Sequence, residues 1–182
     1  LNGLDTRSEA DRRADYLHRV DLVKLGLAGN LKDYTLTTYD GKTVSGAQLD
    51  YNGQGAGFAS QPAENVNYVD AHDNETLFDL ITYKMPADAP MDHRVRMSLI
   101  SQASVALSQS PSSWASGTEM LRSKSLDRDS YNSGDYYNAI DWTMRDNGFG
   151  HGLPVKSKNG AAWDHMRPLL ENPNLKPTSE QI

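Results

Sequence analysis

Apolar residues recur at helical spacing near the start of the chain. The stripe consists of Ala10, Ala14, Leu17, Leu22, Val23 and Leu25. Thr6 followed three residues later by Glu9 forms a capping-box pattern, which marks the start of a helix. Gly26 and Gly29 come directly after the stripe, and glycine is common just past a helix end. The pattern therefore predicts a helix from about Thr6 to about Leu25.

Two further stripes predict helices in the middle of the chain. They consist of Leu77, Leu80 and Ile81, and of Val95, Leu99, Ala103 and Ala106. The first predicts a helix over about residues 75–84, with Asp73 or Asn74 as its cap. The second predicts a helix that begins at Asp92 and ends before Pro111, because proline disfavours α-helical geometry in the residue that precedes it.

Strand signals lie between these helical stripes. Two β-prone runs flank Asp40-Gly41, a dipeptide typical of a hairpin turn. The stretch "VNYVDA" (66–71) predicts a short buried strand, and "SSWASGT" (112–118) predicts another. Residues 50–65 are rich in Gly, Asn and Ser, and we expect them to form a long loop.

The order of these elements favours an α/β fold. Strands that alternate with helices are typical of parallel βαβ units, although two strand candidates are too few to complete a sheet. From about Leu121 the chain is polar and is expected to be loop-like, with one more helix near Trp163–Leu170.

Composition excludes several classes of function. The chain has 182 residues, which is enough for one domain with a sizeable core. It contains no cysteine, so disulfides, thiolate chemistry and cysteine-based zinc sites are excluded. The net charge of −6 is spread along the chain and argues against a nucleic acid partner. No apolar run approaches the roughly 18 residues that a membrane span needs.

The dipeptide His72-Asp73 is the first candidate site. It follows the expected strand 66–71, and ligands of parallel α/β proteins bind outside the carboxyl ends of the strands. An aspartate there can hold sugar hydroxyls or stabilise positive charge at an anomeric carbon, and the histidine can donate to a hydroxyl. On the dipeptide alone, helix capping by Asp73 or Asn74 is favoured, and a cap still leaves one oxygen free. A metal site with Glu75 is a further alternative, although its spacing matches no standard ligand pattern.

The second candidate site is the string "SPSSWASGTEMLRSKSLDRDSYNSGDYYN", in which the strand candidate is followed by a charged segment. It interleaves charged residues with tyrosines, namely Arg122, Lys124, Asp127, Arg128, Asp129 and Asp135 with Tyr131, Tyr136 and Tyr137. Aromatic faces combined with carboxylates and guanidinium groups suit sugar rings, which offer CH faces and hydroxyl edges. The alternative is a solvated loop whose tyrosines pack on the domain, and composition does not separate the two.

Taken together, these strings resemble a known family. "VNYVDAHDNETL" resembles the seventh-strand motif of the α-amylase superfamily, and "SQSPSSWASGTEMLRSKSLDRDSYNSGDYYNAIDW" resembles the eighth-strand region of bacterial pullulanases and plant limit dextrinases. "LVKLGLAGNLKDY", "LDYNGQGAGF" and "DNGFGHGLP" resemble the flanking segments of the same debranching enzymes. The sequence departs from the family at "YYN", where relatives often have Trp-Phe-Asn.

The resemblance implies a particular fold. It indicates the C-terminal portion of a (β/α)8 TIM barrel, with about strands seven and eight, flanking helices and long loops. Such a barrel usually takes about 250 residues. We therefore expect residues 1–182 to be a C-terminal fragment of the catalytic domain, incomplete as it stands, with no second domain within the chain.

The resemblance also implies a retaining hydrolase of α-1,6 branch linkages in pullulan, starch or glycogen limit dextrins. Asp73 matches the carboxylate that stabilises the transition state. The residues expected to bind substrate are His72, Asn74, Asp129, Tyr131 and Asp135. No segment upstream of residue 66 matches the nucleophile or the general acid, so the fragment is expected to be inactive by itself.

The implied partner is an α-glucan polysaccharide or oligosaccharide, with no nucleic acid and no membrane. No cofactor is expected to be required, and calcium is left open. A location outside the cell or at its surface is expected if the protein is like the bacterial pullulanases. The alternatives are a non-catalytic α-glucan-binding module and a fragment of an isoamylase or branching-type relative.

Overall fold

The computed structural model describes residues 5–182, and this part of the chain divides into two compact units. The first unit consists of Val69–Gln102 and Trp114–Ile182, and the second of Asp5–Tyr68 and Ala103–Ser113.

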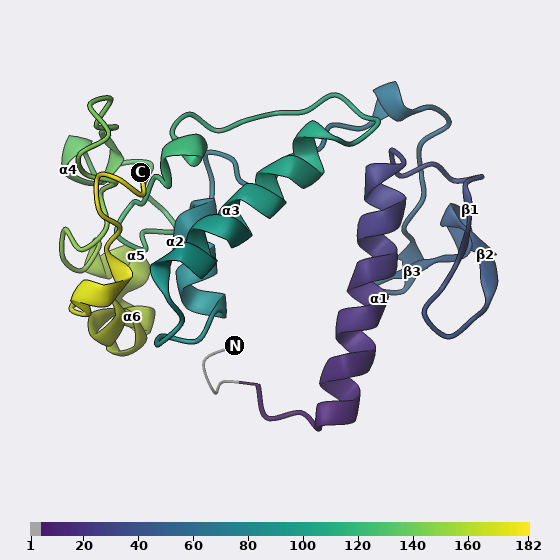
Figure 1. Ribbon diagram of the computed structural model, residues 1–182, viewed down its shortest axis with the longest axis horizontal. Helices are drawn as coiled ribbons and strands as arrows, with labels where there is room; N and C mark the ends of the chain where they lie inside the picture. The colour runs from purple at the N-terminus through teal and green to yellow at the C-terminus, as the bar shows by residue number, and fades with distance from the viewer. Residues whose placement is uncertain (1–4) are drawn as a thin grey trace. The chain divides into compact units, whose positions relative to one another are not determined.

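The second unit begins with helix α1 (Glu9–Leu27), as the apolar stripe predicts (Figure 1). Its cap is Ser8 and not Thr6, because the Ser8 hydroxyl accepts the Asp11 N–H at 3.1 Å. The helix continues through Gly26 and ends in a Schellman motif around Gly29, which has a left-handed φ of 92°. In this motif the N–H of residue 30 bonds to the carbonyl of residue 25, and that of residue 29 to the carbonyl of residue 26, each at 3.0 Å.

The hairpin predicted around Asp40-Gly41 is confirmed. Strands β1 (Thr35–Thr37) and β2 (Thr43–Ser45) pair antiparallel on either side of this turn. The hairpin contributes to a small core with helix α1, whose buried members are Leu25, Leu36 and Leu49.

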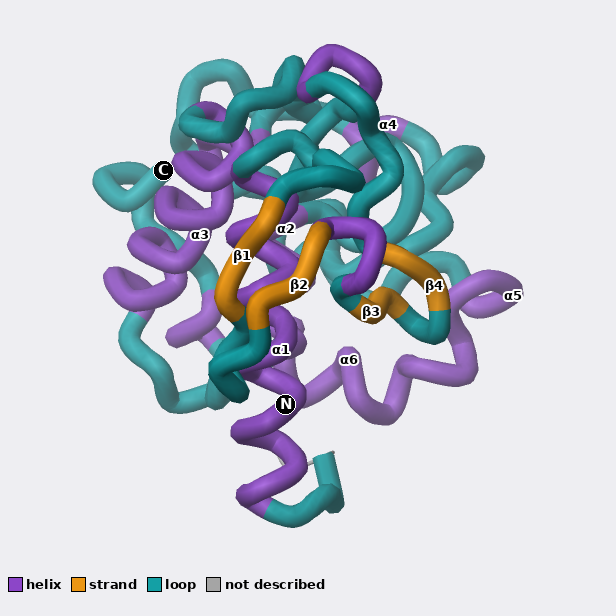
Figure 2. The backbone as a smooth tube through the Cα atoms, turned by 90° about the vertical axis from the view of Figure 1, so that its right-hand side faces the viewer, coloured by secondary structure: helices purple, strands orange, loops and turns teal. Residues whose placement is uncertain are grey.

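The loop expected over residues 50–65 contains a second hairpin. Strands β3 (Asp50–Tyr51) and β4 (Gln54–Gly55) pair antiparallel across Asn52 and Gly53. Both turn residues have left-handed φ angles, 54° and 83°, which is the geometry that Asn-Gly favours in tight hairpins. Figure 2 shows how short the strands of both hairpins are.

The two parallel strands that the sequence predicts do not form within residues 5–182. Within the described residues neither 66–71 nor 112–118 forms a strand, and a single parallel bridge joins Asn67 to Ser112. Val66 and Tyr68 are exposed, so this segment is not buried as predicted. A parallel strand in the interior of a sheet needs neighbours along both edges, and these segments have one bridge between them.

The first unit consists of short helices that enclose an apolar core. The helices are α2 (Leu77–Lys84), the first part of α3 (Met91–Ala106), α4 (Asp135–Asn138), α5 (Lys156–Asn159) and α6 (Trp163–Leu170). Single 3-10 turns lie at Gly46–Gln48 and Pro62–Glu64 in the second unit, and at Thr118–Met120, Gly160–Ala162 and Pro173–Leu175 in the first. The core consists of Phe78, Leu121, Leu126, Phe149, Met166, Leu169 and Leu175. The rings of Phe78 and Phe149 meet edge to face, with centroids 5.8 Å apart.

Helix α3 buries a different face from the one its apolar stripe predicts. Val95 packs against the core, but Leu99 is exposed. Arg94, Ser98 and Gln102 are buried at the helical spacing of four, and so they form the inward polar face. The predicted helix is confirmed, and its predicted orientation is wrong.

None of the helices within residues 5–182 combines the length and the apolar character that a membrane span requires.

Candidate functional site

A hollow of about 200 Å³ in the first unit brings the two candidate regions of the sequence together. Its lining residues are His72, Asp73, Lys124, Arg128, Asp129, Ser130, Tyr131 and Asn138. The lining combines carboxylates, cations, an imidazole, an amide and an aromatic ring, which is the mixture that holds polar ligands with CH faces.

His72 and Asp73 are open to solvent at this hollow. Their side chains are 90% and 82% exposed, and His72 Nδ1 lies 3.2 Å from Asp73 Oδ1. The imidazole therefore orients one carboxylate oxygen of Asp73, and the other oxygen is free to meet a ligand. Within residues 5–182, no group of three His, Asp or Glu side chains is placed to hold a metal ion.

Asp73 does not cap the helix that follows it. Helix α2 begins at Leu77, and its cap is Thr76, whose hydroxyl accepts the Asp79 N–H at 3.2 Å. The Leu77 N–H donates to Asp70 Oδ2 at 2.9 Å, so a buried aspartate further upstream stabilises the helix start. The capping role predicted for Asp73 or Asn74 is therefore wrong, and the Asp73 carboxylate has no structural role at the helix.

Two cations connect the His72-Asp73 segment to the second candidate region. Lys124 Nζ donates to the backbone carbonyl of His72 at 3.2 Å, and Arg128 donates to Asn74 Oδ1 at 3.3 Å. Lys124 is buried, and burial lowers the pKa of its ammonium group, with a further contribution from the neighbouring Arg122 cation. Asn74 thus supports the hollow through Arg128 and does not line it.

The remaining predicted residues lie in different places. Asp129 lines the hollow and pairs with Lys158 through both carboxylate oxygens, at 2.9 and 3.0 Å. Tyr131 is 94% exposed at the rim, where its ring can stack on a ligand. Asp135 does not line this hollow. It belongs to a second one of about 310 Å³ on the same unit.

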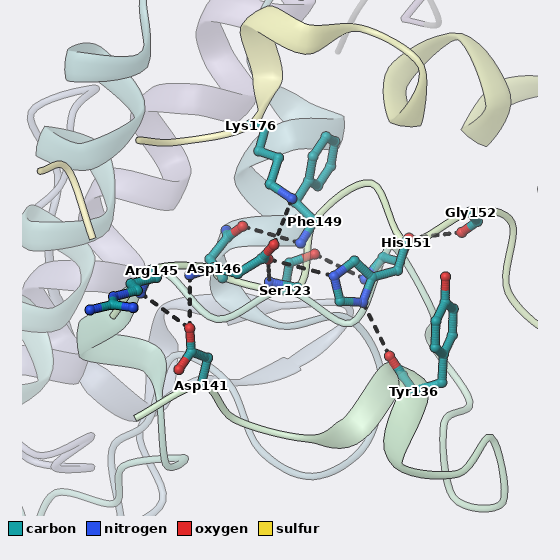
Figure 3. Close-up of polar contacts among 12 residues, drawn as sticks. Ser123, Tyr136, Asp141, Arg145, Asp146, Phe149, His151, Gly152 and Lys176 are labelled. Carbon is teal, nitrogen blue, oxygen red and sulfur yellow. Dashed lines mark hydrogen bonds and ion pairs between the residues drawn. The ribbon is translucent and has the colours of Figure 1, made fainter. Parts of the chain in front are cut away.

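The polar groups of the second hollow bond to one another and to neighbouring residues such as Lys176 (Figure 3). His151 Nδ1 lies 3.2 Å from the Tyr136 carbonyl, and its Nε2 lies 3.5 Å from Asp146. Asp146 also accepts from Lys176 at 2.8 Å. Burial would raise the pKa of the Asp146 carboxyl, but its bonds from Lys176 and the Gly148 N–H hold this pKa below its usual range. The Lys176–Asp146 contact attaches the part of the chain after helix α6 to this hollow.

Sequence reasoning missed the buried aspartates beneath the first hollow. Asp70 accepts the Thr118 hydroxyl at 2.9 Å, which ties the segment before His72 to the start of the second region. Asp79 is fully buried, and burial raises the pKa of its carboxyl to about 6 against the lowering effect of its hydrogen bonds. The apolar stripe gave no signal for Asp79, because this residue does not lie on the helix face of Leu77, Leu80 and Ile81.

Gly148 limits how the second region can pack, and replacing it by alanine should be strongly destabilising. Its φ is +87°, and a Cβ atom would lie 2.5 Å from the Ser123 carbonyl oxygen. The left-handed backbone costs about 1–2 kcal/mol for a non-glycine residue, and the clash adds about 1–3 kcal/mol. We therefore expect Gly148→Ala to lower the free energy of unfolding of the chain by about 2–5 kcal/mol in urea titrations.

Gly152→Ala is the matched control. Gly152 has a φ of +99° and no atom within 4 Å of its Cβ position, so only the backbone cost applies. Equal losses of stability for the two variants would contradict the proposed clash with Ser123.

Comparison with known proteins supports a family assignment. A family model described as "Alpha-1,6-glucosidases, pullulanase-type, C-terminal" matches residues 144–182. The sequence is 44% identical over 182 residues to "Pullulanase 1, chloroplastic" of Arabidopsis thaliana, and 45% identical over 163 residues to a pullulanase of Klebsiella aerogenes. These alignments cover 100% and 90% of this chain but 19% and 14% of the relatives, so the chain spans less than a fifth of their length.

The fold of the chain also resembles that of solved pullulanase structures. The chain matches the crystal structure of apo pullulanase from Klebsiella pneumoniae with a TM-score of 0.91 and 41% identity, over 99% of this chain and 19% of that one. A crystal structure of Klebsiella pneumoniae pullulanase complexed with maltotriose matches equally well, with a TM-score of 0.91, over 99% of this chain and 17% of that one.

Proposed function

Because this chain belongs to the pullulanase family of α-1,6-glucosidases, we propose that it forms the C-terminal part of a debranching enzyme that hydrolyses α-1,6 linkages in pullulan, starch or glycogen limit dextrins. The observation that carries this proposal is the first hollow, where the exposed His72-Asp73 pair meets the charged and aromatic side chains of the second region. An α-glucan chain is neutral and offers hydroxyl edges and CH faces, which suit this lining.

The proposed role of Asp73 is electrostatic. In a retaining glycosidase, one carboxylate attacks the anomeric carbon while a second carboxylic acid protonates the glycosidic oxygen, and the sugar ring passes through an oxocarbenium-like transition state. The free oxygen of Asp73 would lie against this positively charged ring and stabilise it. His72 would donate to a hydroxyl of the same sugar and fix its orientation.

The other residues of the hollow would bind the glucan without touching the bond that breaks. Asp129 offers carboxylate oxygens to hydroxyls, and Tyr131 offers a ring face. Asn74 would act through Arg128, which it holds beside the hollow. Asp135 would contact a more distant sugar, because it lies at the second hollow.

The architecture that we propose for these segments is the end of a (β/α)8 barrel. The parallel bridge between Asn67 and Ser112 supports this, because it joins the two segments expected to be neighbouring strands. The Asn67 N–H donates to the Pro111 carbonyl, and the Ser113 N–H donates to the Asn67 carbonyl, each at 2.9 Å. Asp73 would then lie beyond the carboxyl end of the seventh strand, which is where TIM-barrel active sites lie. Residues 1–182 would form the last part of the catalytic domain.

The isolated 182-residue chain is expected not to release reducing sugar from pullulan. No segment upstream of residue 66 resembles the nucleophile or acid motifs, and Asp73 breaks no bond without them. The assay compares the purified chain with the complete enzyme, which here means the protein that carries this segment together with the nucleophile and the acid. Sugar release by the chain above a buffer blank would contradict the proposal that Asp73 needs a nucleophile and an acid from outside this segment.

A non-catalytic α-glucan-binding module is the second candidate function, and the exposed ring of Tyr131 favours it. Such a module would bind maltotriose, but the complete protein would release no sugar from pullulan. It would also have no Asp and Glu at the ends of upstream strands in its complete reading frame.

A further inference from the structure

Asp79 connects helix α2 to the loop that lines the first hollow. Its side chain is fully buried in the first turn of the helix. One carboxylate oxygen accepts the Ser123 hydroxyl, and the other accepts the backbone N–H groups of Lys124 and Leu126, at 2.9 and 3.2 Å. We refer to residues 121–128 as the anchored loop, because three of the loop's N–H and O–H groups donate hydrogen bonds to this carboxylate.

The anchored loop has a backbone that needs such support. Leu121, Ser125 and Leu126 have φ angles of 55°, 53° and 65°, in the left-handed region that residues other than glycine rarely adopt. Two of them are consecutive. Strained residues of this kind persist only where surrounding contacts hold them, and the bonds to Asp79 lie on either side of Ser125.

The position of this loop decides where the cations of the hollow lie. Lys124 bonds to the His72 carbonyl, and Arg128 bonds to Asn74. Both therefore meet the segment that carries Asp73. A loop that moved away from Asp79 would shift Lys124 and Arg128 relative to Asp73 and would change the shape of the hollow.

The opposite side of the loop is held independently. The Ser123 N–H donates to the Asn147 carbonyl at 2.7 Å, and the Ser125 hydroxyl donates to the Gly152 carbonyl at 2.8 Å. Loss of the Asp79 carboxylate would therefore release one side of the loop and leave the other attached, so the loop would shift without detaching.

We propose that Asp79 is a positioning residue for glucan binding, whose carboxylate holds the anchored loop so that Lys124 and Arg128 lie beside Asp73. The inference rests on the proposed function, because it concerns binding of the same substrate. Asp79 touches no substrate, and it acts only through the loop.

The test compares variants of the complete enzyme on pullulan. Asp79→Ala removes both acceptor oxygens and with them all three hydrogen bonds to the anchored loop. We expect KM to rise at least about tenfold with a smaller change in kcat, because substrate-binding groups move and the reacting groups do not. Asp79→Asn should restore most of the affinity. Its amide oxygen can accept the Lys124 and Leu126 N–H groups, and its NH2 group can donate to the Ser123 hydroxyl oxygen.

Thr76→Ala is the matched control for stability. It removes the cap of the same helix and the Thr76 contact with the Asp79 carboxylate, but none of the three bonds between Asp79 and the anchored loop, so it should lower the melting temperature and leave KM unchanged. Ser123→Ala, which removes one of the three donors, should give an intermediate KM and keeps the test decisive if Asp79→Ala does not fold. Equal KM values for Asp79→Ala and Thr76→Ala, or an unchanged KM for Ser123→Ala, would overturn the proposal.

Hydrogen exchange provides a readout that does not depend on activity. The amides of residues 121–128 should exchange faster in Asp79→Ala than in the unsubstituted enzyme, and should not change in Thr76→Ala. Unchanged exchange in Asp79→Ala would overturn the proposed anchoring. An unsubstituted enzyme that leaves α-1,6 linkages intact would instead overturn the proposed function, and the exchange rates would still decide the role of Asp79.

Discussion

Replacing Asp73 by asparagine in the complete enzyme is expected to lower kcat by about 100- to 1,000-fold and to leave KM nearly unchanged. Asparagine keeps the shape of the side chain and one oxygen that can accept a hydrogen bond, but it removes the negative charge that would stabilise the oxocarbenium-like transition state. The measurement is steady-state kinetics on pullulan at saturating and limiting substrate.

The structure indicates that this substitution tests the catalytic role of Asp73 without changing the stability of the fold. Thr76 caps helix α2, and the Asp73 side chain is 82% exposed, so the substitution should not change the melting temperature. Asp164→Asn is a matched control, because Asp164 is also exposed and lies on helix α6, away from both hollows. A kcat of Asp73→Asn within about threefold of the control would remove Asp73 from the proposed mechanism.

Replacing Phe149 by alanine is expected to lower the free energy of unfolding of the chain by about 3–5 kcal/mol. Phe149 has no exposed surface, its ring meets that of Phe78 edge to face, and it belongs to the core of the first unit with residues of helix α6. The substitution loses both the transfer free energy of the ring and the contacts around the cavity that remains. Urea unfolding followed by circular dichroism measures the change.

Trp142→Ala is the control for the size of the side chain. Trp142 is 66% exposed, so removing its ring should change the free energy of unfolding by less than about 1 kcal/mol. If Phe149→Ala were no more destabilising than Trp142→Ala, the core described for the first unit would be wrong.

The elements that the sequence predicted correctly depend on contacts within a few residues. Helix α1 follows from one apolar stripe with a glycine stop, and the β1–β2 hairpin follows from Asp40-Gly41. Helix α6 was expected over the range in which it occurs. The β3–β4 hairpin could have been predicted as well, because Asn52-Gly53 carries the same kind of local signal.

The elements that the sequence predicted wrongly depend on distant neighbours. Residues 66–71 have the composition of a strand, but a strand exists only where other strands pair with it, and the described residues supply one bridge. The stripe of helix α3 predicts the wrong face, because burial of Arg94 and Ser98 is decided by what packs on the helix. The first part of the polar loop expected after Leu121, residues 121–127, is largely buried, because Asp79 satisfies its donors.

The candidate site shows the same division. The sequence by itself determined that His72 and Asp73 stand next to each other before a helix, and that charged residues and tyrosines alternate in the second region. Only the tertiary structure decided that Lys124 and Arg128 meet the segment of His72, since their bonds to His72 and Asn74 join residues that are 52 and 54 positions apart. Local pattern specifies which groups are available, and the buried bonds of Asp79 specify where the second region lies, because a buried carboxylate must find its donors within the fold.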